Sequence, residues 1–176
     1  MRFARSALLA AVAAMVPLAG CTTPRATGGR ISSVSGTVVF TPQGTGTFVE
    51  IGSTRIQVRV PGGAVTVPTT FRIGQVAGKA ELIAPLPSGR ILVGGLNFFG
   101  AALNQGVPVE FRVPVALTLP AGTPLQVFAA DDRLAPLRFV PVLGPDGNAL
   151  FTQVQPDNRI PLATGFLGQF IFATVP

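Results

Sequence analysis

Few side chains in this sequence of 176 residues could perform covalent or acid–base chemistry. There is one cysteine, Cys21, and no histidine. Without histidine the chain lacks the commonest general base and the Ser-His-Asp arrangement, and it lacks most zinc and copper sites. No G-x-S-x-G, S-x-x-K or phosphate-binding P-loop motif occurs either. We therefore predict no catalytic residue, no bound metal and no dissociable cofactor.

Carboxylates are the remaining candidates for chemistry. Glu50, Glu81 and Glu110 could supply the two carboxyl groups that glycoside hydrolysis requires about 5 to 9 Å apart. Asp131 and Asp132 could offer oxygen ligands to Ca²⁺, although acidic residues at this kind of position also shape turns. No spacing singles out a pair. A carbohydrate-binding protein or a glycan-acting enzyme that uses acidic residues therefore stays open as the alternative to a non-enzymatic domain.

The cysteine stands at the end of a segment that has the features of an export signal. Arg2 and Arg5 precede an apolar run over residues 7–16, which matches the charged and apolar regions of a signal peptide. The run is shorter than the stretch of about 20 apolar residues that spans a bilayer as a helix. Residues 1–20 are accordingly predicted to be a helical signal peptide that is removed.

The last residues of this segment, Leu18, Ala19, Gly20 and Cys21, form a recognisable motif. It resembles the lipobox of bacterial lipoproteins, in which an aliphatic residue and two small residues precede an invariant cysteine. The resemblance implies a diacylglyceryl group on the Cys21 thiol and cleavage before Cys21. It also implies that the new amine is acylated, for example with palmitate. A thiolate is the nucleophile that such a thioether requires. The alternative is an ordinary secretory signal that leaves a free thiol at Cys21.

Lipidation would place the protein on a membrane of the cell envelope. Its acyl chains would be the attachment to the bilayer, at about 0.8 kcal/mol for each buried CH₂. Thr22 follows the cysteine, where an aspartate resembles the inner-membrane retention signal of enteric bacteria. We therefore expect an exported, lipid-anchored protein in the outer membrane rather than the inner membrane.

The rest of the chain divides into a tether and one domain. Residues 21–35 are small, polar and rich in glycine, which is typical of a flexible linker. Residues 36–176 have the length of one domain, and the 48% hydrophobic content with 13 Phe in the whole chain predicts a packed core. The net charge of +6 is spread thinly, whereas nucleic-acid-binding proteins cluster their positive charge. We expect no nucleic-acid partner.

The domain has the pattern of many short strands. Residues 54–60 and 113–119 alternate apolar and other side chains with a period of two, and the turn residues at 144–148 predict a hairpin. No segment after the signal has helical periodicity, and proline interrupts most windows. This pattern predicts an all-β antiparallel sandwich of about ten short strands. The other expected strands are 37–40, 47–51, 70–76, 80–84, 91–98, 107–111, 125–129, 139–143, 149–154 and 169–175.

Several motifs are similar to those of the ZU5 domain. Residues 56–65 read IQVRVPGGAV and are followed by TTFRI at 69–73; FRVPVALTLP stands at 111–120. The order of an alternating strand, a Pro-x-Gly-Ala turn and a second alternating strand resembles that family over about residues 46–175. The resemblance implies a sandwich that contacts other proteins or surfaces. The self-cleavage of some eukaryotic members is not expected, because GFLG at 165–168 replaces their His-Phe-Ser.

Arginines on the strands are the remaining candidates for binding. Because outward residues of a strand repeat at every second position, Arg55, Arg59 and Arg72 could form one basic stripe that holds acidic glycans or lipid phosphates. A solvated outer face that discourages edge-to-edge aggregation is the alternative. The expected function is a membrane-anchored cell-envelope lipoprotein whose sandwich is a non-enzymatic interaction or structural module. Its expected partners are the bilayer, envelope proteins and anionic envelope polymers.

Overall fold

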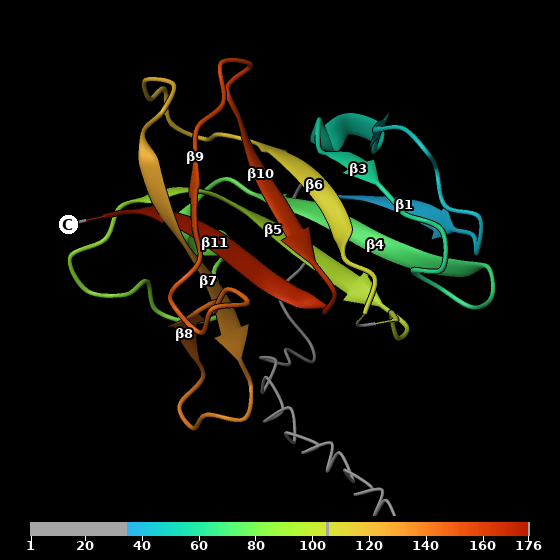
Figure 1. Cartoon of the computed structure of the whole chain (residues 1–176). Helices are drawn as coiled ribbons and strands as arrows, with labels where there is room; N and C mark the ends of the chain where they lie inside the picture. Colours follow the sequence, from blue (N-terminus) through green and yellow to red (C-terminus); the bar gives the residue numbers. More distant parts are fainter. Residues whose placement is uncertain (1–34, 105, 176) are drawn as a thin grey trace, which may run out of the picture.

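The computed structural model of the protein describes residues 35–104 and 106–175. These residues form an antiparallel all-β sandwich (Figure 1), which confirms the predicted fold class. The predicted signal peptide, the lipobox with Cys21, and the tether up to Val34 lie outside the described residues. Of the two short helices that the structure describes, neither has the length and hydropathy needed to cross a membrane.

Eleven strands and two 3₁₀ helices make up the described chain. In order they are β1 (Ser35–Phe40), β2 (Val49–Glu50), η1 (Gly52–Thr54), β3 (Gln57–Arg59), β4 (Thr69–Val76), η2 (Lys79–Glu81), β5 (Leu92–Gly100), β6 (Val109–Pro114), β7 (Pro124–Asp131), β8 (Arg138–Pro141), β9 (Phe151–Gln153), β10 (Arg159–Thr164) and β11 (Gly168–Thr174).

The strands form two antiparallel sheets. The large sheet has seven strands in the order β1-β4-β5-β11-β7-β8, and β9 also pairs with β7. The small sheet has four strands in the order β10-β6-β3-β2. Strands β8 and β9 pair with successive parts of β7. The predicted turn at 144–148 joins these two strands, and a bridge between Leu143 and Ala149 closes it as a tight hairpin.

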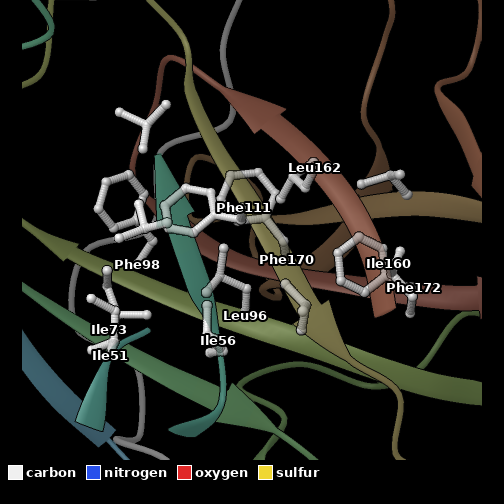
Figure 2. Close-up of a cluster of buried hydrophobic side chains, with 14 of the residues drawn as sticks. Ile51, Ile56, Ile73, Leu96, Phe98, Phe111, Ile160, Leu162, Phe170 and Phe172 are labelled. Carbon is white, nitrogen blue, oxygen red and sulfur yellow. The ribbon is translucent and has the colours of Figure 1, made fainter. Parts of the chain in front are cut away.

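The main core lies between the sheets and is rich in phenylalanine (Figure 2). Alternate residues of each strand point inward, as the period of two predicts. Phe98 on β5 of the large sheet contacts Phe71 on β4, with ring centroids 5.3 Å apart, and Phe111 on β6 of the small sheet, at 4.9 Å. Phe40 stacks on Phe71 at 4.5 Å. This row of rings joins the two sheets through aromatic contacts as well as buried area.

A second apolar cluster lies on the outer face of the large sheet. Val76, Phe128 and Ile171 are among its buried members, and leucines of the segment 82–86 pack on it. The fully buried Gln169 fastens this segment to the sheet: its Oε1 accepts a hydrogen bond from the Ile83 N–H at 3.0 Å, and its Nε2 donates to the Glu81 carbonyl at 2.9 Å. Burial of a polar group is tolerated here because it is hydrogen-bonded.

Several strand predictions differ from the structure. The strand expected over 54–60 is shorter, Gln57–Arg59, because Gly52–Thr54 is a 3₁₀ helix. Residues 80–84 were expected to be a strand, but Lys79–Glu81 is a 3₁₀ helix, because the Glu81 carboxylate accepts hydrogen bonds from the Ala77 and Gly78 N–H groups and closes a turn. The strand expected over 113–119 ends at Pro114, and the sequence analysis missed β10. Pro161 interrupts the strand pattern of β10, yet it is tolerated because β10 is an edge strand.

Paired glycines serve close packing and turns. Gly94 and Gly95 lie in β5, beside a register shift between Phe172 and Ala173 of β11 that marks a bulge. A Cβ on Gly95 would lie 2.5 Å from the Phe170 carbonyl oxygen, so no larger residue fits there. Gly63 has a φ of +82° in the turn after β3.

Candidate functional site

The carboxylates that could have formed a catalytic pair or a cation site are divided between the two sheets. Glu50 is on β2 and Glu110 on β6 of the small sheet, whereas Glu81 ends η2 and Asp131 ends β7 of the large sheet. Asp132 follows β7 directly. Within residues 35–104 and 106–175, no three His, Cys, Asp or Glu side chains lie together in a way that could hold a metal ion.

Basic partners hold several of these carboxylates. Arg133 donates to both oxygens of the buried Asp131, at 2.8 and 2.7 Å, and these side-chain hydrogen bonds hold the pKa of Asp131 below its usual value. Arg159 lies 3.4 Å from Glu50. Asp131 therefore shapes the turn after β7, as one reading of the sequence expected.

The three arginines of the predicted basic stripe do not form one. Arg59 is on β3 of the small sheet and Arg72 on β4 of the large sheet. Because Val58 and Phe71 face the core between the sheets, Arg59 and Arg72 point to opposite outer faces of the sandwich. Arg55 is not in a strand: it ends η1 with a φ of +57° and is exposed. The prediction of a basic stripe was wrong because it used spacing along the chain, whereas strand register and sheet membership decide which residues share a face.

The outer face of the small sheet instead gathers charged residues from four strands. Its core-facing residues are buried, so the alternate residues point to solvent. Cross-strand register then brings the polar side chains together, with Arg59 opposite Glu110 and Gln57 opposite both Glu50 and Arg112. We call this surface the Arg–Glu face. Its members are Phe48, Glu50, Gln57, Arg59, Glu110, Arg112 and Arg159.

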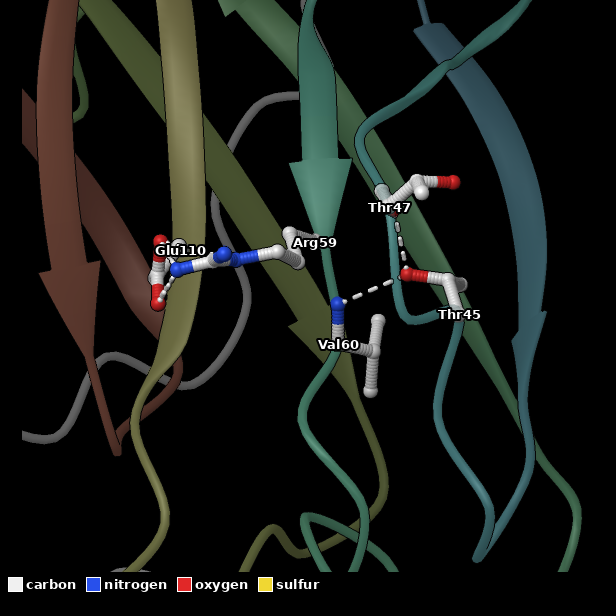
Figure 3. Close-up of polar contacts among 5 residues, drawn as sticks. All are labelled: Thr45, Thr47, Arg59, Val60 and Glu110. Carbon is white, nitrogen blue, oxygen red and sulfur yellow. Dashed lines mark hydrogen bonds and ion pairs between the residues drawn. The ribbon is translucent and has the colours of Figure 1, made fainter.

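The Arg59–Glu110 pair is the shorter of the two ion pairs of the Arg–Glu face among the described residues (Figure 3). Arg59 donates to Glu110 through Nε, at 3.1 Å from Oε2, and through Nη2, at 2.5 Å from Oε1. Both side chains are partly exposed, at 43% and 32%. They border an open depression of about 290 Å³ whose other lining residues come from segments 43–46 and 60–62. Thr45 ties these segments together, because its Oγ1 accepts from the Val60 N–H at 3.0 Å.

Phe48 organises the arginines of this face. The Arg112 guanidinium lies 4.2 Å from the centroid of the Phe48 ring, and that of Arg59 lies 5.4 Å from it. Such contacts restrain an arginine while leaving its N–H groups in the plane free to bind. Arg112 is exposed, and among the described residues no carboxylate forms an ion pair with it. Sequence analysis missed Phe48 and Arg112, because only the pairing of β2 with β3 and of β3 with β6 brings them near Arg59.

No protein-family model matches the chain, and no curated protein is significantly similar to it. The similarity to the ZU5 domain thus rests on the quoted motifs, and the assignment stays a prediction.

Proposed function

We propose that this protein is a cell-envelope lipoprotein, anchored through lipid on Cys21, whose β-sandwich is a non-enzymatic interaction module. The observation that carries the proposal is the order of Arg2 and Arg5, an apolar run and Leu18-Ala19-Gly20-Cys21 at the start of the chain. The single cysteine stands at the one position that the lipobox requires. The outer membrane is the proposed location, because Thr22 rather than aspartate follows it.

The described surface supports a binding module better than a glycan-acting enzyme. An acid–base mechanism of glycoside hydrolysis needs two carboxyl groups on either side of one substrate bond. Glu81 and Asp131 belong to the large sheet and its covering segment. Glu50 and Glu110 share the Arg–Glu face, but each is paired with an arginine, Arg159 and Arg59 respectively. The motif order that resembles the ZU5 domain also supports a sandwich that contacts proteins or surfaces.

Mass spectrometry of the mature protein tests the anchor directly. Protein extracted from membranes with detergent should begin at Cys21 and carry a diacylglyceryl thioether, with or without an acyl group on the amine. A chain that begins elsewhere, or that has an unmodified thiol at Cys21, would contradict the proposal. In either case the protein would be an ordinary secreted sandwich.

Anionic envelope polymers are the partner class that the Arg–Glu face supports. Glu110 and Glu50 neutralise Arg59 and Arg159, while Arg112 keeps its charge and is held against Phe48. A restrained guanidinium binds a carboxylate or phosphate through two parallel hydrogen bonds. The face therefore offers one oriented anion-binding group beside a shallow depression.

Replacing Arg112 with alanine tests this role. With polygalacturonate as the probe in isothermal titration, we expect Arg112→Ala to weaken binding about fivefold, which corresponds to roughly 1 kcal/mol for an exposed site. The matched control is Arg72→Ala, which removes an equally exposed arginine from the opposite face. Equal losses in both variants would mean that binding depends on net charge alone, and that the Arg–Glu face is not the site.

A further inference from the structure

We propose that the free edge of β1 pairs antiparallel with β1 of a second copy of this chain, joining two large sheets into one. Strand β1 ends the order of the large sheet, next to β4 (Figure 1). Its six residues pair with β4 without a register shift. Among the described residues, β4 is its only strand partner, and the backbone hydrogen bonds of turns and loops do not involve residues 35–40. Within residues 35–104 and 106–175, the other edge of β1 therefore has no backbone partner.

The other edge strands of the two sheets have features that oppose such pairing. Strand β10 contains Arg159 and Pro161, β8 contains Arg138 and Pro141, and β2 and β9 are only two and three residues long. Charge, proline and shortness are the usual means by which proteins protect sheet edges. Strand β1 has the sequence SGTVVF, with no charge and no proline. It is also rich in β-branched residues, which favour strand pairing.

A second copy of this chain is the occupant that fits this edge. An uncharged strand offers no charge complementarity to a charged peptide, whereas its own copy meets it without like-charge repulsion. In a two-fold antiparallel pair the outward residues of β1 face one another, so Thr37 lies opposite Thr37 or Val39 of the copy, depending on the register. Val39 is 55% exposed, and the neighbouring strand would cover part of its side chain.

The length of chain before β1 permits this pair on one bilayer. Residues 21–34 precede β1, and these 14 residues span at most about 50 Å when extended. In an antiparallel pair the two tethers start at opposite ends of a six-residue strand, about 20 Å apart. Both lipidated cysteines therefore reach the same membrane. This step rests on the proposed anchor; the arguments from the edge itself do not.

Disulfide formation across the two-fold axis tests the pairing. Thr37→Cys and Val39→Cys are introduced into the full-length protein, expressed singly and together, and oxidised in membranes. A disulfide requires Cα atoms within about 7 Å, which opposite or adjacent positions of paired strands satisfy. The matched control is Thr70→Cys: Thr70 is the register partner of Val39 on β4 and is equally outward. Two copies of Thr70 would lie about 14 Å apart, three strand spacings, and should not cross-link.

We expect covalent dimers from the β1 cysteines at least tenfold above the level of Thr70→Cys. Adding Val39→Lys to Thr37→Cys should abolish them, because a lysine on an edge strand opposes its pairing with a second strand, whereas Thr70→Lys should leave them unchanged. Cross-linking no greater in β1 than at Thr70 would overturn the pairing. The same variants in a Cys21→Ser background separate the two proposals. Membrane association that does not depend on Cys21 would contradict the lipid anchor. Absence of cross-links in the lipidated protein would contradict the pairing of β1.

Discussion

Replacing Cys21 with serine is expected to transfer the protein from the membrane fraction to the soluble fraction. Two or three acyl chains, at about 0.8 kcal/mol for each buried CH₂, make release from a bilayer negligible, whereas serine accepts no thioether-linked lipid. We expect more than nine-tenths of the wild-type protein in the washed membrane pellet, on the basis of that energy, and most of the Cys21→Ser protein in the supernatant once its leader has been removed.

The control must distinguish attachment through the lipid from attachment through an uncleaved leader. Cys21→Ser also removes the cleavage site of a lipoprotein, so an uncleaved leader with its apolar run at 7–16 could hold the variant on the membrane. The serine variant is therefore also expressed behind a leader that ordinary signal peptidase removes. Thr23→Ser, two residues from the lipobox cysteine, should fractionate as the wild type does. Serine protein that is cleaved and still pelleted would contradict anchoring through Cys21.

The core of the sandwich was predictable from the sequence because side-chain alternation is a local property. Ile56, Val58 and Val60 were expected on one side of a strand, and all three are fully buried. The same reasoning failed at 113–119, where Leu117 is 42% exposed. There the chain leaves β6 after Pro114, and alternation continues without a partner strand. Alternation shows which residues can share a face; a strand also needs a neighbour, which the sequence does not specify.

The charged face was less predictable, because it depends on pairing between distant segments. Arg59 and Glu110 are 51 residues apart, and they meet because β3 pairs with β6 in one particular register. Spacing along the chain suggested Arg55 and Arg72 as the companions of Arg59, but the turn after η1 and the change of sheet separate them. Long-range register, which turn lengths and core packing fix together, is the missing information.

Replacing Phe98 with alanine is expected to give the largest loss of stability of any single substitution considered. Phe98 is fully buried and its ring contacts Phe71 within the large sheet and Phe111 across the core. Truncation removes apolar area and leaves a cavity between two sheets that cannot close fully, at a cost of about 3 to 5 kcal/mol. Because domains are stable by about 5 to 15 kcal/mol, this loss should shift the urea midpoint strongly.

Phe99 supplies the matched control for this measurement. It follows Phe98 on β5, points to the opposite face of the large sheet and is only partly buried. Phe99→Ala removes the same atoms but leaves an open surface rather than a cavity, so it should cost roughly a third as much or less, since the cavity contribution is absent. Both substitutions are compared by urea denaturation in the Cys21→Ser background, with circular dichroism as the signal. Equal losses would show that the row of rings formed by Phe40, Phe71, Phe98 and Phe111 does not hold the two sheets together.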